Sequence, residues 1–126
     1  MIDTQYYMEW SASNNMAEET CWTFVSKVLF EVFQITLPKL KAQEDIFLHQ
    51  KEVIKQQQLN GSWNATVDPK SGDVVLLMLR GIRPHVGIMN SANTFLHFSE
   101  TDRMVKMGSC QSFQWRNRIE GFYRHS

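Results

Sequence analysis

The sequence lacks the features that mark membrane, secreted and nucleic-acid-binding proteins. No window approaches the roughly 18 consecutive apolar residues of a membrane span, and the N-terminal segment has neither the basic start nor the apolar run of a secretory signal. The 13 basic and 13 acidic residues cancel, so no overall electric field attracts the chain to nucleic acid. We therefore expect a chain that is made in the cytoplasm, with no nucleic-acid partner and no membrane insertion.

Cysteine is scarce as well. Cys21 and Cys110 are the only two cysteines, which is too few for a disulfide scaffold, and a reducing compartment argues against a bond between them. We interpret them as separate thiols. Neither Cys-x-x-Cys nor His-Glu-x-x-His occurs in the sequence, so no zinc-binding motif is present and we predict no metal and no cofactor.

The composition is that of one folded domain with helices before strands. The 126 residues, of which 43% are hydrophobic, suffice for one core, and we predict a single domain over residues 1–126. Apolar residues recur every three or four positions over 22–33, which predicts a buried helix that ends before Pro38. A second pattern over 43–58 predicts a surface helix, and residues 64–66 are interpreted as a polar loop.

The second half of the chain has extended rather than helical patterns. Short apolar segments bounded by turn residues predict strands at 74–79, 85–89, 95–98, 104–107 and 119–123. The links between them are short, which suits antiparallel pairing. We therefore predict an α+β fold in which N-terminal helices pack on one face of an antiparallel β-sheet.

Cys21 stands where the first helical pattern begins, directly after Thr20. The Thr20 hydroxyl is suited to cap the first turn, and the positive end of the helix dipole would stabilise a Cys21 thiolate. Two alternatives stay open. Asn15 and Glu18 have the spacing of a capping box, which would move Cys21 into the second turn, and a cysteine here can also be a small buried hydrophobic residue.

Two histidines lie on neighbouring predicted strands. If these strands form a hairpin around residues 90–93, His85 and His97 become a cross-strand pair. A thiol, an imidazole within reach and a polar group that orients the imidazole form an activated nucleophile. Taken singly, either histidine is better explained by a structural or surface role.

The order of these motifs resembles the NlpC-like family of papain-fold cell-wall peptidases, in particular the small versions carried by tailed phages. The matching segments share their order and spacing with that family, and they are Thr20-Cys21-Trp22-Thr23-Phe24-Val25, Gly72-Asp73-Val74-Val75, His85-Val86-Gly87-Ile88, Phe95-Leu96-His97 and Arg118 to His125. The resemblance covers nearly the whole chain except the region around 43–58. It implies a papain-like fold.

The resemblance also implies roles for individual residues. Cys21 would be the nucleophile, His85 the general base, and His97 the group that orients His85. Tyr7 would lie near the oxyanion site, with Tyr6 as its rival. The implied reaction is hydrolysis of amide bonds in peptidoglycan stem peptides through a Cys thioester, and the implied location is the virion tail, with phage tail proteins as partners.

Two further interpretations compete with this one. In the first, the chain is a structural tail-assembly protein that keeps the fold but has little activity. The presence of Thr20 in place of the family's usual acidic residue suggests this interpretation. Alternatively, a circularly permuted relative would use Cys110 as nucleophile. Cys110 follows a polar Gly108-Ser109 context with no helical pattern after it, which disfavours that alternative.

Overall fold

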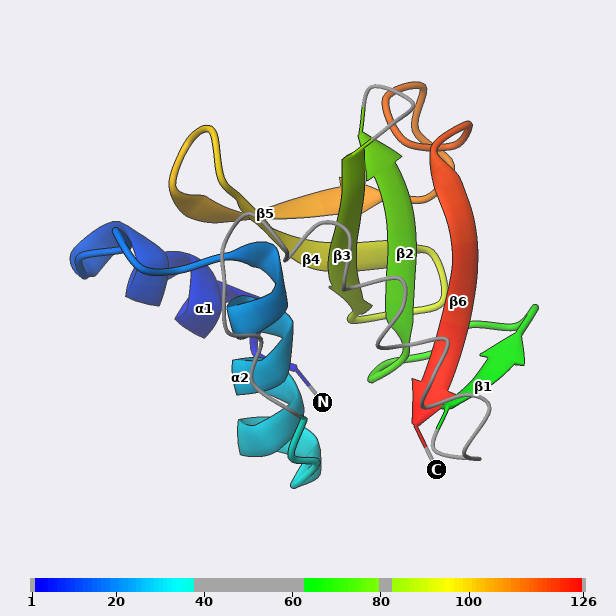
Figure 1. Cartoon of the computed structure of the whole chain (residues 1–126), viewed down its shortest axis with the longest axis horizontal. Coiled ribbons are helices and arrows are strands. Elements are labelled where there is room, and N and C mark those ends of the chain that lie inside the picture. The colour runs from blue at the N-terminus through cyan, green and yellow to red at the C-terminus, as the bar shows by residue number, and fades with distance from the viewer. Residues whose placement is uncertain (1, 38–62, 80–82, 126) are drawn as a thin grey trace.

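The computed structural model describes residues 2–37, 63–79 and 83–125. Within these ranges the chain forms two helices followed by six strands. Figure 1 shows the helices on one side of a strongly twisted sheet. The predicted surface helix at 43–58 lies outside the described residues. The α+β prediction, with N-terminal helices packed on an antiparallel sheet, is confirmed.

The predicted buried helix is α2, Cys21–Phe33. Its apolar residues face the sheet because they repeat with the period of the helix, and they are Trp22, Phe24, Val25, Val28 and Leu29. The helix ends at Gln34, which adopts a left-handed conformation with φ of 56° and donates its N–H to the carbonyl of Phe30. The helix therefore ends several residues before Pro38.

Helix α1, Thr4–Ser13, was missed by the sequence analysis. Its sequence is polar with only a weak apolar face, and only Tyr7 and Ser11 are buried. Asp3 caps the helix by accepting the N–H of Tyr6, and the Ser11 hydroxyl accepts the Val105 N–H at 2.9 Å. Contact with the sheet thus stabilises this helix, which the pattern alone did not indicate. None of the helices in the described ranges is long and apolar enough to span a membrane.

The strands form one antiparallel sheet with the order β1-β6-β2-β3-β4-β5. Their bounds are β1 Trp63–Thr66, β2 Val74–Leu79, β3 Arg83–Met89, β4 Thr94–Ser99, β5 Met104–Ser109 and β6 Ile119–His125. All five predicted strands are present. The interpretation of 64–66 as a loop was wrong, because these residues pair with β6, and Trp63 beside them is fully buried.

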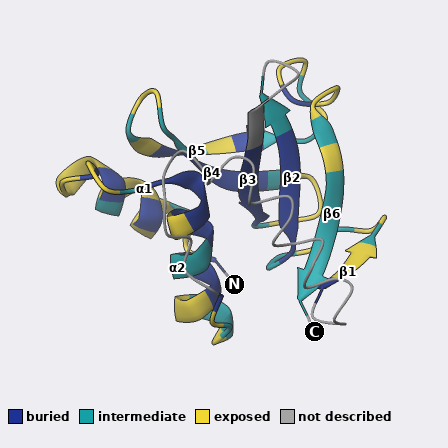
Figure 2. Cartoon of the chain, in the orientation of Figure 1, coloured by how far each residue is buried: buried dark blue, intermediate teal, exposed yellow. Residues whose placement is uncertain are grey.

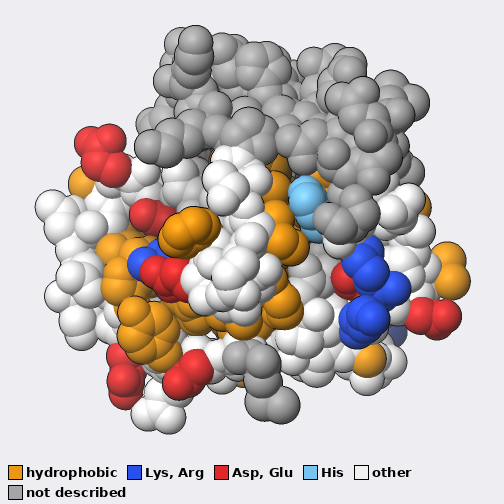
Figure 3. All heavy atoms as spheres, turned by 90° about the horizontal axis from the view of Figure 1, so that it is seen from below, with side chains coloured by type: hydrophobic (Ala, Val, Ile, Leu, Met, Phe, Trp, Pro, Cys, Tyr) orange, Lys and Arg blue, Asp and Glu red, His pale blue; other side chains and the backbone are white. Residues whose placement is uncertain are grey.

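The two faces of the sheet bury different cores. One face packs on the helices and carries the even-numbered residues of the central strands, which are Val74, Leu76, Val86, Ile88, Leu96 and Phe98. The opposite face carries Val75, Leu77, Met89 and Phe95, and Trp115 from the β5–β6 connection covers it. Figure 2 shows the buried positions concentrated in β2 to β4 and on the inner side of α2. In the view from below, hydrophobic side chains also gather at the surface, with charged side chains at their edge (Figure 3).

Strands β3 and β4 pair along only part of their length. The pairs are Ile88↔Leu96 and Met89↔Phe95, although β3 begins at Arg83 and β4 runs to Ser99. Beyond these pairs the two strands diverge, and β4 and β5 run across the direction of β2 and β3 (Figure 1). Helix α2 packs against both β3 and β4. At its beginning β3 therefore pairs with β2 on one edge, while the edge toward β4 is not paired within the described residues.

The Gly72-Asp73 motif holds the start of β2 in place. Gly72 has φ of 98°, where side chains are strained, and a Cβ there would lie 2.9 Å from the ring of Phe33. Asp73 is buried and accepts two hydrogen bonds from Arg124 on β6, at 2.9 and 2.8 Å. This bidentate pair links β2 to β6. The motif is thus structural in this chain.

Candidate active site

Helix α2 begins at Cys21 with Thr20 as its N-cap. This is the first of the two capping arrangements that the sequence analysis considered. The Thr20 hydroxyl accepts the Thr23 N–H at 3.1 Å, and the Thr20 N–H donates to the Thr23 hydroxyl at 2.8 Å, which is a reciprocal capping box. The alternative cap at Asn15 is wrong. Cys21 is therefore the first residue of the helix, where the dipole favours a thiolate most. It is also fully buried, with 0% exposure.

The imidazoles of His85 and His97 meet on the sheet face opposite the helix-packed core. His85 Nε2 lies 3.0 Å from His97 Nδ1, and the ring planes are nearly perpendicular with centroids 5.1 Å apart. Both side chains are buried, with 2% and 6% exposure. The hydrogen bond occupies Nε2 of His85, so a second group would interact with this ring through Nδ1.

The two histidines are not the direct cross-strand pair that the sequence analysis predicted. The observed register pairs Ile88 with Leu96, and its continuation places His97 opposite Gly87, two positions from His85 on the same face. The histidines are therefore diagonal neighbours whose side chains bridge the offset. Gly87 is required at this place, because a Cβ would lie 2.9 Å from the Leu96 carbonyl oxygen.

Burial keeps His97 neutral. Removal from water, and to a smaller extent the positive charge of Lys106 opposite it on β5, together lower its pKa from 6.5 to about 4. A neutral His97 can accept a hydrogen bond on Nδ1. It is therefore suited to hold His85 in one tautomer over the whole neutral pH range.

Trp115 forms the wall of the histidine pair. Its ring lies parallel to the His85 ring, with centroids 6.4 Å apart and 12° between the planes, and it meets His97 edge-on at 5.1 Å. Trp115 itself is 5% exposed. The indole excludes water from both imidazoles and restricts their rotation.

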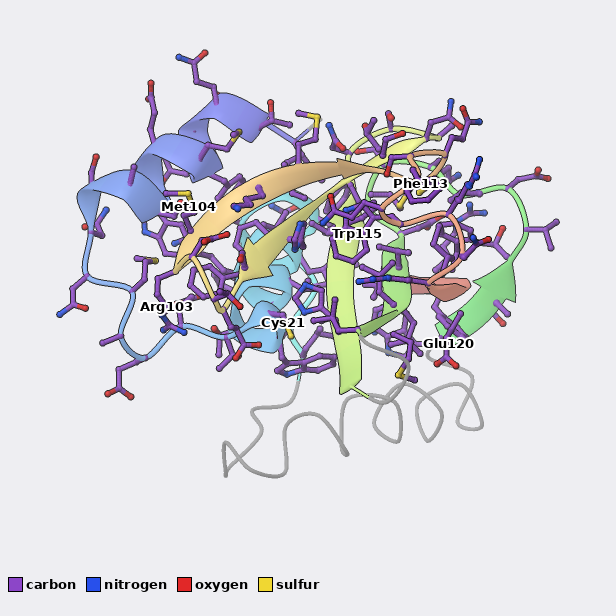
Figure 4. All side chains as sticks on the ribbon, turned by 90° about the horizontal axis from the view of Figure 1, so that it is seen from above. Cys21, Arg103, Met104, Phe113, Trp115 and Glu120 are labelled. Carbon is purple, nitrogen blue, oxygen red and sulfur yellow. The ribbon has the colours of Figure 1, made fainter. Side chains whose placement is uncertain are left out.

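The start of α2, β3 and the β4–β5 turn meet at one point. The Sγ of Cys21, a ring nitrogen of His85 and a carboxylate oxygen of Glu100 all lie within 4.8 Å of one another. Figure 4 shows Cys21 at the start of α2, close to the sheet. Because the paired stretch of β3 and β4 ends before His85, the helix terminus can approach the imidazole. The site thus contains a thiol beside an imidazole that a second imidazole orients.

Comparison with known proteins agrees with this geometry. The model of the NlpC/P60 family matches residues 5–124. The chain belongs to the NlpC/P60 family. This is a family of cell-wall cysteine peptidases, and the two helices on a six-stranded antiparallel sheet are consistent with its papain-like fold. A search of curated proteins found no similar sequence.

Tyr7 of this NlpC/P60 chain lies against α2. Its hydroxyl donates to Glu31 at 2.8 Å, and Glu31 lies about three turns beyond Cys21 on α2, or about 15 Å along the axis. Burial, and then the hydrogen bond to Glu31, raise the pKa of Tyr7 far above its ordinary value. The ring of Tyr7 also packs against Phe24, one turn after Cys21 on α2, and its expected place near the oxyanion site stays a prediction. Its rival Tyr6 is half exposed on α1.

The sequence analysis missed Glu100 and Trp115. Glu100 had no visible signal, because it stands in a polar turn among other charged residues. Trp115 offered a weak signal, since a large aromatic residue in a polar, turn-rich segment usually packs on something. Glu18 and Glu19, which lie just before Thr20 in the sequence, are not in the cluster found among the described residues.

Proposed function

We propose that this NlpC/P60 chain is a cysteine endopeptidase that hydrolyses amide bonds in peptidoglycan stem peptides. One observation carries the proposal, namely the Cys21 thiol at the positive end of α2 within reach of the His85 imidazole. That arrangement is what a thiol needs in order to attack an amide near neutral pH. The substrate class comes from the family.

The reaction proceeds by acyl transfer to sulfur. His85 Nδ1 takes the thiol proton, and the Cys21 thiolate attacks the amide carbonyl to form a C–S bond. The tetrahedral adduct collapses as His85 returns the proton to the leaving amine, which breaks the C–N bond and leaves a thioester. A water molecule then gives a proton to His85 and attacks the thioester. The carboxylic product leaves and Cys21 regains its proton.

His97 positions His85 rather than touching the substrate. In the productive tautomer His85 donates its Nε2–H to His97 Nδ1, which leaves the Nδ1 lone pair of His85 directed away from His97 and available to the thiol. His97→Asn retains an acceptor, so we expect a milder loss of kcat than in His85→Ala. Equal losses in the two variants would contradict a purely orienting role.

Mass spectrometry of products from defined muropeptides tests the assignment. We expect Cys21→Ala to reduce cleavage by several orders of magnitude while the circular dichroism spectrum is unchanged. Cys110→Ala is the matched control, because Cys110 is the second thiol and burial raises its pKa, which disfavours the thiolate. Loss of activity in Cys110→Ala with full activity in Cys21→Ala would reverse the assignment.

A structural tail-assembly protein is the second candidate. The complete burial of Cys21 favours it, since a substrate carbonyl must reach the sulfur in any acyl transfer. A zymogram on cell-wall material distinguishes the two functions, because the enzyme clears the substrate and a structural protein does not.

Association with a phage tail is a further part of the proposal. Its support is the resemblance of residues 118–125 to the closing strand of phage versions; this segment contains β6, between β1 and β2. Mass spectrometry of purified virions and their tail fractions tests it. Absence of the chain from tails that are otherwise complete would remove the virion location and the tail-protein partners while leaving the enzymatic proposal intact.

A further inference from the structure

The site holds one charged group that the proposed mechanism does not use. Glu100 comes from the turn after β4, and its carboxylate lies within 4.8 Å of both the Cys21 sulfur and a His85 nitrogen. Its Oε2 atom is buried and has no hydrogen-bond partner in the part of the chain that the structure describes. A buried carboxylate oxygen without a donor is costly. A bound cation would compensate that cost.

The three donors together are those that zinc prefers. Thiolate, imidazole and carboxylate all bind Zn²⁺, at about 2.0–2.3 Å, and tetrahedral ligands then lie about 3.3–3.6 Å apart. Separations of at most 4.8 Å need only small side-chain rotations to reach those values. A site with one carboxylate and one thiolate is unsuited to Mg²⁺ or Ca²⁺, which require several oxygen ligands. Three protein ligands leave the fourth position to water.

The surroundings of His85 already have the form of a metal-ligand support. Histidine ligands usually donate the second ring N–H to a neighbouring acceptor, which orients the metal-binding nitrogen. Here His97 Nδ1 lies 3.0 Å from His85 Nε2, and Trp115 stacks on the His85 ring. These contacts fix the orientation of the His85 ring, so its Nδ1 can bind a metal ion without any change in the fold.

We propose that Cys21, His85 and Glu100 form a Zn²⁺ site that inhibits the enzyme reversibly. Binding exchanges the Cys21 S–H proton for an S–Zn bond and releases that proton to solvent, so affinity rises with pH. The metal occupies the sulfur and the His85 nitrogen that acyl transfer needs. Metal binding follows from the three donors alone, whereas the inhibitory consequence rests on the proposed peptidase function.

Direct measurement of metal binding tests the site independently of activity. The full chain is first freed of metal with a chelator and then titrated with Zn²⁺ by calorimetry, and we expect one ion per chain. Co²⁺ provides a second probe, because a cobalt–thiolate bond produces a charge-transfer absorption when a cysteine is a ligand. The spectrum is measured on the unmodified chain and on Cys110→Ala, in which Cys21 is the one remaining thiol.

Variants assign the ligands. Glu100→Gln should weaken Zn²⁺ binding by at least about 10-fold. Loss of a residue that only supports a metal ligand already costs roughly 10- to 100-fold in affinity, and loss of a direct ligand should cost at least the lower of these values. Cys21→Ser should remove the cobalt–thiolate absorption. Glu18→Gln is the matched control, because Glu18 is exposed and close to Cys21 in sequence but lies outside the cluster; we expect it to bind Zn²⁺ as tightly as the unmodified chain.

The outcomes separate this inference from the proposed function. A missing cobalt–thiolate band, or Zn²⁺ affinity that is unchanged in Glu100→Gln, overturns the metal site even if the chain cleaves muropeptides. Stoichiometric binding through Cys21 and Glu100 in a metal-free chain that cleaves nothing supports the site and removes the peptidase. Binding together with inhibition that a chelator reverses supports both.

Discussion

Replacement of His97 by glutamine should remove much of the protein's loss of stability in acid. His97 is buried against Phe95 and Trp115, and burial first, then Lys106, lower its pKa from 6.5 to about 4. Between these values the unfolded chain binds a proton at this position and the folded chain does not. The free energy of unfolding must therefore rise with pH across this window and fall as the pH drops through it.

The size of the effect follows from the pKa change. A shift from 6.5 to about 4 corresponds to about 3 kcal/mol, at about 1.4 kcal/mol per pKa unit. The contribution is fully present above about pH 7, and most of it is lost by about pH 4.5. For a protein with a total stability of about 5–15 kcal/mol, a change of that size is readily measured.

Urea unfolding followed by tryptophan fluorescence, with a chelator present, provides the assay at several pH values. The difference between the unmodified chain and His97→Gln isolates the contribution of His97 from that of the other titrating groups. Lys106→Met is the control. It removes only the smaller cause of the lowered pKa, so it should retain most of the pH dependence.

The reasoning would be refuted if the free energy of unfolding changed equally with pH in the unmodified chain and in His97→Gln. That result would mean that His97 titrates alike in the folded and unfolded states. Complete loss of the slope in Lys106→Met would refute it differently, by showing that charge rather than burial controls the pKa of His97.

Three further predictions concern packing and the fold. Trp115→Ala should destabilise the chain by about 3–5 kcal/mol and lower kcat, measured by urea unfolding and muropeptide cleavage; unchanged kcat would exclude a role in holding the histidines. Asp73→Ala breaks the bidentate pair with Arg124 and should cost about 3 kcal/mol of unfolding free energy. A cost near zero would show that the pair does not stabilise the fold. Gly72→Ala places a Cβ at a residue with φ of 98°, 2.9 Å from the ring of Phe33, and should cost about 1–3 kcal/mol in the same assay; a neutral result would show that the turn relaxes.

Local patterns were sufficient for the elements that bury a continuous apolar face. Helix α2 and the five strands from β2 to β6 were predicted because their apolar residues repeat with the helix or strand period. Helix α1 and β1 were not, since neither has such a face. Their stability comes from partners far along the chain, such as Val105 for Ser11 and His125 for Trp63.

The candidate site divides in the same way. The placement of Cys21 at a helix start was visible in the sequence because a cap acts over three or four residues. The sequence predicted that His85 and His97 lie close together, but it did not predict the register of their strands. That register is set by the pairing of β3 with β4 at Ile88 and Leu96.

By itself, the sequence determined the α+β class, the helix that begins at Cys21 and the strands that carry the two histidines, because each depends on contacts between near neighbours in the chain. Only the tertiary structure decided that Glu100 stands beside Cys21 and His85, that Trp115 shields the imidazoles, and that Tyr7 bonds to Glu31. The physical reason is that these contacts depend on where β3 and β4 separate and on how α2 packs across them. Strand register and helix packing arise from the whole core, and no single segment of the chain encodes them.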